Sequence, residues 1–94
     1  MNHWSAFEEL IMIKLLEACY IGGHRIELAF SDGRRGIFNV KTYLATRQGP
    51  LLKALHDETY LRRFFVDAGA LCWPNGLELS PARLYEISLM EIAA

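Results

Sequence analysis

The fold is decided by residues 26–34, which read Ile-Glu-Leu-Ala-Phe-Ser-Asp-Gly-Arg. Ile26, Leu28 and Phe30 alternate with polar or small residues, and this period of two places the three apolar side chains on one face of a β-strand. Residues 31–34 predict a hairpin, because a tight type I′ turn needs positive φ at both central residues and an Asp-Gly pair tolerates that.

The register of this hairpin follows from the length of its loop. With Asp-Gly as a two-residue loop, the chain returns as a second strand from about Arg35 to Val40. In that register Leu28 lies opposite Ile37. Phe30 lies opposite Arg35, whose aliphatic stem would cover the edge of the ring.

The segment before the hairpin supports two interpretations. Ser5 and Glu8 fit a capping box, and apolar residues recur at helical spacing through 5–18, which predicts a helix. The alternative is a strand over 12–20 that ends at the glycine pair 22–23. Continuous apolar runs cannot be assigned by periodicity alone, so the residues leave both interpretations open.

Short helices are predicted after the returning strand. Residues 41–48 form a helical turn with Tyr43 and Leu44 directed inward, and Pro50 suits the first position of the next helix. Asp57 is a suitable N-cap for one further turn. The apolar stripe of the helix that begins at Pro50 would comprise Leu51, Leu52 and Leu55.

The last third of the chain predicts a second hairpin and a final helix. Residues 65–67 and 71–73 flank a turn at Ala68-Gly69, and Pro74-Asn75-Gly76 forms another turn. Ser80 caps the last helix, with proline at its first position. We therefore expect an α+β domain with a mainly antiparallel sheet of four or five short strands, two or three helices on one face, and the order β-β-β-α-(α)-β-β-α.

Composition limits the classes of function. The 94 residues suffice for a single domain with one modest core, and the 52% hydrophobic and 22% charged content is ordinary for a globular fold. A formal net charge of -1 lacks the basic excess typical of nucleic-acid-binding chains. No apolar run reaches the roughly 20 residues of a membrane helix, and we expect a cytoplasmic protein. Cys19 and Cys72 are predicted to be buried free thiols.

Residues with catalytic potential are scattered. The three histidines, His3, His24 and His56, lack the spacing of a zinc site, and no serine lies in a nucleophile motif. No glycine-rich phosphate loop precedes a helix, so no cofactor is expected. The remaining candidates for acid–base chemistry are three carboxylates, for which a turn or solvated role is the alternative. They are Asp32, Asp67 and Glu78. We therefore expect that the protein is not an enzyme.

Two surface features are candidates for an interaction site. The run Trp73-Pro74-Asn75-Gly76 would either present an aromatic interface anchor or place Trp73 in the core before a turn. The arginine pairs 34–35 and 62–63 would either form a joint basic patch or be separately solvated. The basic residues concerned are Arg34, Arg35, Arg62 and Arg63.

The run from Cys72 to Pro81, followed by Leu84-Tyr85, resembles the end of the bacterial domain-of-unknown-function family 2442. Further similar pieces are Leu28 to Gly33 with Gly36, Gly49-Pro50, Phe64 and Val66-Asp67. The resemblance covers about 12–85 and leaves 1–11 as an extension. It implies that 12–20 is the first strand. Two residues depart from the family: Asn39 stands where the family often has an acid, and Glu78 stands where it often has aspartate.

The resemblance also bears on function. The family has no assigned activity, but some members are encoded beside another short protein in an arrangement typical of regulatory or toxin–antitoxin pairs. Others carry a helix-turn-helix domain, which we do not expect here. The sequence therefore favours a small non-catalytic binding or regulatory module that acts on a protein partner or on a second copy of itself. The alternative is a nucleic-acid-binding transcriptional regulator that uses the arginine pairs.

Overall fold

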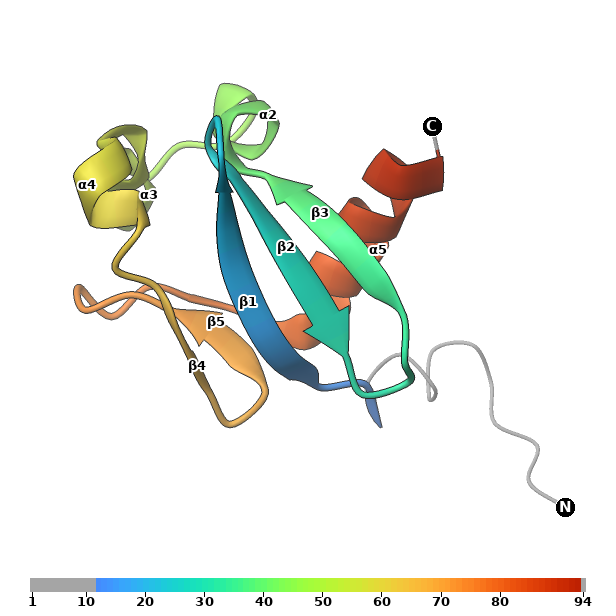
Figure 1. The fold of residues 1–94 in the computed structure, drawn as a ribbon. Helices are drawn as coiled ribbons and strands as arrows, with labels where there is room; N and C mark the ends of the chain where they lie inside the picture. Colours follow the sequence, from blue (N-terminus) through green and yellow to red (C-terminus); the bar gives the residue numbers. More distant parts are fainter. Residues whose placement is uncertain (1–11, 94) are drawn as a thin grey trace, which may run out of the picture.

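The protein is described here by a computed structural model, which covers residues 12–93. Its elements run in the order three strands, four short helical segments, three strands and one long helix (Figure 1). They are β1 (Leu15–Gly22), β2 (Arg25–Phe30), β3 (Arg35–Asn39), α2 (Val40–Ala45), α3 (Pro50–Lys53), the 3₁₀ turn η1 (Ala54–His56), α4 (Glu58–Leu61), β4 (Phe65–Asp67), β5 (Ala70–Cys72), β6 (Glu78–Leu79) and α5 (Pro81–Ala93).

The strands form two antiparallel sheets, β1-β2-β3 and β4-β5-β6. The α+β class is confirmed, but the prediction of a single sheet with four or five strands is wrong. Strands β4 and β5 pair with each other and with no strand of the first sheet, and the turn at 74–76 folds the chain back so that an unpredicted strand, β6, pairs with β5.

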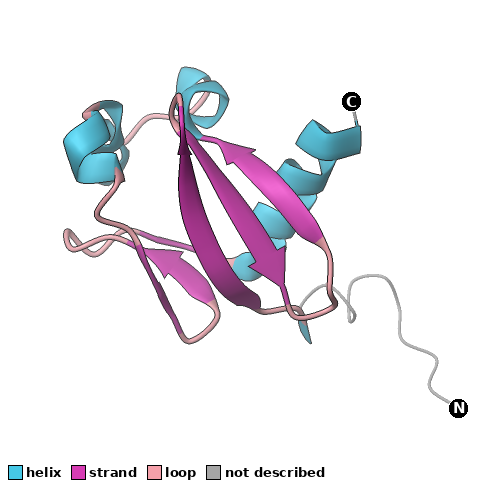
Figure 2. Ribbon diagram, viewed as in Figure 1, coloured by secondary structure: helices cyan, strands magenta, loops and turns pink. Residues whose placement is uncertain are grey.

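The helices do not all cover one sheet face. Figure 2 shows α5 across one side of the first sheet, while α2, α3 and α4 gather near the end where β1 turns into β2. The backbone N–H of Val40 donates to the carbonyl of His24 at 2.8 Å, which joins the start of α2 to the β1–β2 turn. Among the described helices, α5 covers one face of the first sheet, and none lies across the other face.

The β1 strand confirms the strand interpretation that the family resemblance implied. The helix predicted through 5–18 is wrong over 15–18, and its capping box at Ser5 and Glu8 lies outside the described residues. A bulge between Leu15 and Glu17 adds one residue, so that Leu15 and Ala18 both face inward. This i, i+3 spacing imitates helical periodicity.

The β2–β3 hairpin has a three-residue loop, 31–33, and the predicted two-residue loop is wrong. The Phe30 N–H donates to the Arg34 carbonyl at 2.9 Å, and Gly33 has φ of 90°. This geometry fits a turn followed by a glycine bulge. The register consequently shifts by one residue, and Leu28 lies opposite Gly36.

A one-residue shift turns every β3 side chain to the other face. Ile37 and Arg35, which were predicted to face Leu28 and Phe30, instead lie on the outer face, and the Arg35 stem does not cover Phe30. Phe38 faces inward in their place.

Gly36 allows α5 to approach the first sheet closely. A Cβ atom at this position would overlap the side chain of Ser88, which is fully buried on α5. The Ser88 hydroxyl has no hydrogen-bond partner among the described residues. Two small residues at this crossing thus set the distance between helix and sheet.

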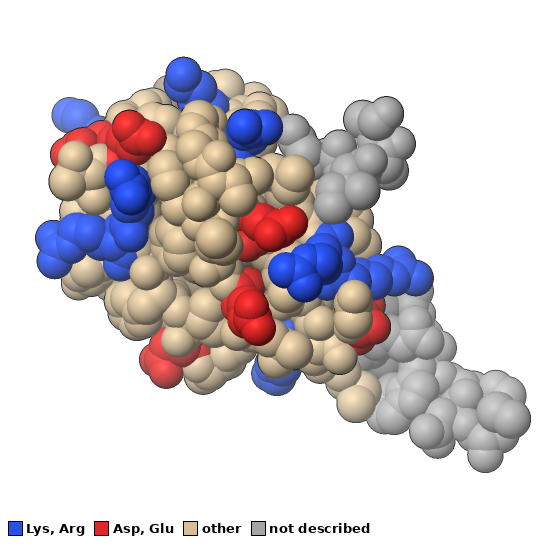
Figure 3. Space-filling view, viewed as in Figure 1, with Lys and Arg blue, Asp and Glu red and all other residues tan. Residues whose placement is uncertain are grey.

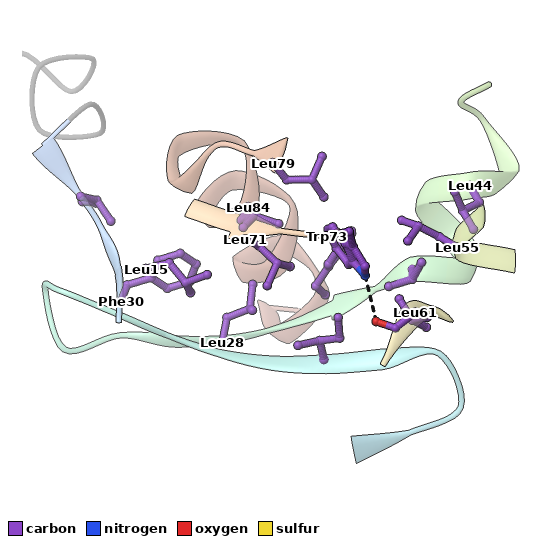
Figure 4. Close-up of a cluster of buried hydrophobic side chains, with 14 residues drawn as sticks. Leu15, Leu28, Phe30, Leu44, Leu55, Leu61, Leu71, Trp73, Leu79 and Leu84 are labelled. Carbon is purple, nitrogen blue, oxygen red and sulfur yellow. Dashed lines mark hydrogen bonds between the residues drawn. The ribbon is translucent and has the colours of Figure 1, made fainter. Parts of the chain in front are cut away.

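Trp73 occupies the centre of the core, as the second interpretation of its motif predicted (Figure 4). Its side chain is 1% exposed, and the indole N–H donates to the carbonyl of Leu61 at 2.9 Å. The core around it draws on both sheets and on the helices. Its buried members are Ile13, Leu15, Ile26, Leu28, Phe30, Phe38, Val40, Leu44, Leu55, Leu61, Leu71, Trp73, Leu79 and Leu84.

Helix caps follow the sequence, and the predicted leucine stripe does so in part. The side chains of Asp57 and Ser80 accept backbone N–H bonds at the starts of α4 and α5, as predicted. Asn39 caps α2 in the same way. Leu55 is buried and Leu52 is half-buried, as predicted, whereas Leu51 is 42% exposed. Helix α3 ends after four residues, so Leu55 belongs to the 3₁₀ turn that follows.

Candidate functional site

The two arginine pairs lie at different ends of the molecule. Arg34 and Arg35 belong to the β2–β3 hairpin and Arg62 and Arg63 follow α4, and Figure 1 shows these elements at opposite ends. The structure therefore does not bring the four arginines together into one patch.

Each arginine of the two pairs already has a partner. Arg34 and Arg35 form ion pairs with Asp32 at 3.8 Å and with Glu27 at 3.7 Å. The guanidinium groups that follow α4 lie over aromatic rings, at 5.3 Å and 5.5 Å from the centroids. The stacked pairs are Arg62 with Tyr20 and Arg63 with Tyr60.

The Trp73-Pro74-Asn75-Gly76 run divides between core and surface. Trp73 is buried, while the next three residues are exposed in a three-residue loop closed by Trp73 and Leu77. The Asn75 side chain accepts the Leu77 N–H at 3.0 Å and donates to the Leu51 carbonyl at 3.2 Å. The loop thus uses its polar groups to hold its own shape and to contact α3.

Asp32 has a structural role at the hairpin tip. Its carboxylate accepts the Arg34 N–H at 3.0 Å and the hydroxyl of Tyr85, from α5, at 2.5 Å. Burial opposes ionisation of Asp32, but these hydrogen bonds and the Arg34 charge outweigh it, so that the pKa of the carboxyl lies below its usual value. Burial and the bond to Asp32 raise the pKa of Tyr85.

The other two candidate carboxylates are exposed. Asp67 ends β4 and Glu78 begins β6, the two strands on either side of β5. This arrangement gives neither carboxylate the enclosed position that acid–base catalysis uses.

The cysteines differ in their surroundings, and both are free. Cys72 is buried in β5, and burial raises the pKa of its thiol. Cys19 is exposed on the outer face of β1, so its predicted burial is wrong. The apolar residues beside Cys19 in the sequence do not indicate its burial. Ala18 and Tyr20 pack against the core on the other face of the strand, and Ile21 is itself exposed.

Within residues 12–93 no three His, Cys, Asp or Glu side chains come together as metal ligands. His24 has a positive φ of 59° in the β1–β2 turn, and its Nε2 atom lies 3.3 Å from the carbonyl oxygen of His56. His3 lies outside the described residues. The same part of the chain contains no helix with the length and apolar character needed to span a membrane.

Sequence reasoning missed the exposed side of the first sheet, which we call the open sheet face. None of the described helices covers it in Figures 1 and 2, and in Figure 3 it is a broad area with acidic groups within it and basic groups beside them. Its apolar side chains outnumber its charged ones. The face comprises Leu16, Glu17, Cys19, Ile21, Glu27, Ala29, Arg35 and Ile37.

Large apolar side chains on this face remain in contact with solvent. Leu16 is 59% exposed and Ile21 is 39% exposed. Exposed apolar groups gathered on one surface are typical of interaction sites. The alternation in β1 would have revealed Cys19 and Ile21 as outward residues once the bulge at Leu16 was known.

The β3 strand adds an open edge to this face. Since Phe30 bonds to Arg34 across the hairpin, the alternating antiparallel pattern directs the backbone groups of Gly36 and Phe38 toward β2. The backbone groups of Arg35 and Ile37 therefore point away from the sheet. Such an edge can accept another strand.

This geometry defines a class of protein: a small α+β domain with a well-filled core, an open sheet face and an open strand edge. The chain belongs to the family described as protein of unknown function (DUF2442), whose model matches residues 15–89. No curated protein and no solved structure matches the chain.

Proposed function

We propose that this protein is a non-catalytic binding module that acts on a protein partner through the open sheet face. The proposal is supported by the apolar side chains that this face leaves exposed, above all Leu16 and Ile21. Covering them would remove apolar area from water, which is the main driving force of protein association.

The charged groups of the open sheet face suit recognition. Glu27 and Arg35 form an ion pair on its surface, and Glu17 lies on the neighbouring strand. Glu27 lies on the middle strand, between Cys19 and Ile37. Charged groups among apolar ones contribute specificity and association rate more than affinity. We infer a regulatory or antitoxin-like role, in keeping with the gene pairs that the family resemblance implies.

A capture experiment tests this function. The tagged chain and a Leu16→Glu, Ile21→Glu variant are used to capture proteins from the native host. Leu51→Glu is the matched control, because Leu51 is similarly exposed but lies on α3. We expect one protein to be retained by the wild type and the control, and reduced about tenfold or more by the double variant, because each glutamate would be buried unpaired. Equal capture by all three chains would overturn the proposal.

Self-association is the second mode of binding that we propose. The open edge of β3 is five residues long and centred on Ile37, so two copies can pair antiparallel about this residue and form one continuous sheet. Ile37→Pro removes a backbone N–H that β2 does not use, so this variant should retain the fold. We expect a concentration-dependent dimer in sedimentation that Ile37→Pro abolishes. A wild type that stays monomeric throughout would exclude this mode.

A further inference from the structure

A cavity of about 500 Å³ lies between α2, α3 and the 3₁₀ turn, on elements remote from the open sheet face. This volume falls in the range of small-molecule sites in proteins. Figure 1 shows a loop joining α2 to α3 near the end of the first sheet, and the 3₁₀ turn contacts both helices. The side chains that matter here are Leu44, Arg47, Gln48, Leu52, Lys53 and His56.

The cavity combines an apolar wall with a basic rim. Leu44 is buried and Leu52 is half-buried, and both line the cavity. Arg47, Lys53 and His56 line the same space, and no acidic residue lines it. An apolar wall beside uncompensated positive charge is suited to an organic anion.

The positive charge of this cavity is not neutralised by described neighbours. The only two ion pairs among residues 12–93 lie on the first sheet and its hairpin. The nearest acids in sequence already have partners, because Asp57 accepts the Thr59 N–H and Glu58 accepts the hydroxyl of Tyr20. The charges of the rim are therefore available to a ligand.

Arg47 is held in position by its neighbour. Its guanidinium lies over the ring of Tyr43, at 4.6 Å from the centroid. A stacked guanidinium keeps its N–H donors free at the edge of its plane and loses less conformational freedom on binding. Tyr43 lines a neighbouring hollow that Arg47 also lines, so the contact orders the Arg47 side chain at the boundary between the two.

We propose that this cavity binds a small organic anion with an apolar body. The anionic group lies between Arg47 and Lys53, and the apolar part packs against Leu44 and Leu52. Arginine and lysine donors bind carboxylate, phosphate and sulfonate groups through charge-assisted hydrogen bonds. This site is independent of the protein-binding role, since it shares no residue with the open sheet face.

Two fluorescent probes with the same aromatic body test the proposal. Anilinonaphthalene sulfonate carries a negative charge, and N-phenylnaphthylamine is its neutral counterpart. We expect the anionic probe to bind the full chain at one site and to shift the amide resonances of Gln48, Gly49 and Lys53. The neutral probe should bind at least about tenfold more weakly, because it lacks the charge-assisted bonds.

Matched variants locate the binding. Arg47→Gln with Lys53→Gln removes both charges while keeping much of the side-chain length, and Arg83→Gln removes an exposed charge from α5 as the control. We expect about a tenfold or greater loss of anionic-probe affinity in the double variant and no change in the control. Equal binding of both probes, resonance shifts confined to the open sheet face, or no saturable binding would overturn the proposal.

Discussion

The substitution Gly36→Ala tests the register of β3 relative to β2 most directly. In the structure Gly36 faces inward, and a methyl group there would overlap the side chain of Ser88 and lie 3.2 Å from its backbone carbonyl carbon. Helix α5 would have to move outward. Overpacking of this kind costs about 1–3 kcal/mol, which corresponds to a fall in Tm of roughly 4–8 °C for each kcal/mol in a domain of this size.

The alternative register predicts the opposite sign. With a two-residue loop, Gly36 would face solvent, and alanine would stabilise the strand by about 0.5–1 kcal/mol because it has less conformational freedom in the unfolded chain. Urea unfolding of the wild type and the variant measures the difference. A variant as stable as the wild type, or more stable, would refute the inward placement of Gly36.

A double-mutant cycle tests whether the loss of stability in Gly36→Ala comes from the contact with Ser88. Ser88→Gly makes room for the new methyl group but costs about 0.5–1 kcal/mol in helix propensity. We expect Gly36→Ala with Ser88→Gly to be more stable than the sum of the single effects by about 0.5–3 kcal/mol. Simple additivity would mean that the two positions do not touch.

Three further predictions follow from single contacts. Trp73→Phe should destabilise the fold by about 2–3 kcal/mol in urea unfolding, because it leaves a gap and an unpaired carbonyl on Leu61, and a loss below about 0.5 kcal/mol would contradict the core role. The pKa of Asp32 is lower in the folded chain than in the unfolded chain, so the ionised carboxylate stabilises the fold at neutral pH. The difference in unfolding free energy between the wild type and Asp32→Asn should therefore narrow from about pH 5 to about pH 2. A difference that does not change with pH would contradict this role of Asp32. A thiol reagent should modify exposed Cys19 rapidly and buried Cys72 only on unfolding, and equal rates would contradict the burial.

Much of the fold was predictable because turn and cap residues act locally. The Ser80 and Asp57 caps, the turn at Ala68-Gly69 and the burial of Trp73 all follow from their own chemistry. The α+β class follows from these local features taken together with the alternation before Asp32.

Loop lengths were not predictable from the same residues. The Asp-Gly and Asn-Gly pairs both lie in three-residue loops, at 31–33 and 74–76, with glycine at positive φ in the third position. The two-residue loops are instead 23–24 and 68–69. They include His24 and Ala68, which adopt φ of 59° and 51° although neither is glycine.

The candidate site was beyond sequence reasoning for a physical reason. Whether Ile21 or Cys19 is exposed depends on which face of β1 turns toward the core, and β1 packs against β4 and β5, which lie far along the chain. The cavity likewise depends on how α2 and the 3₁₀ turn, which are separated by a loop and α3, come into contact. Arginine pairs stand out in a sequence, but their separation in space decides whether they act jointly.

Amide hydrogen exchange along β3, for the protein alone and in complex with a captured partner, tests the binding role most directly. We predict that the amides of Arg35 and Ile37 exchange quickly in the free protein, because β2 does not use them, and that those of Gly36 and Phe38 exchange slowly. In the complex, exchange at Arg35, Ile37 and the β1 positions of the open sheet face should slow at least about tenfold. Slowing confined to α2, α3 or α5, with β1 and β3 unchanged, would contradict this account.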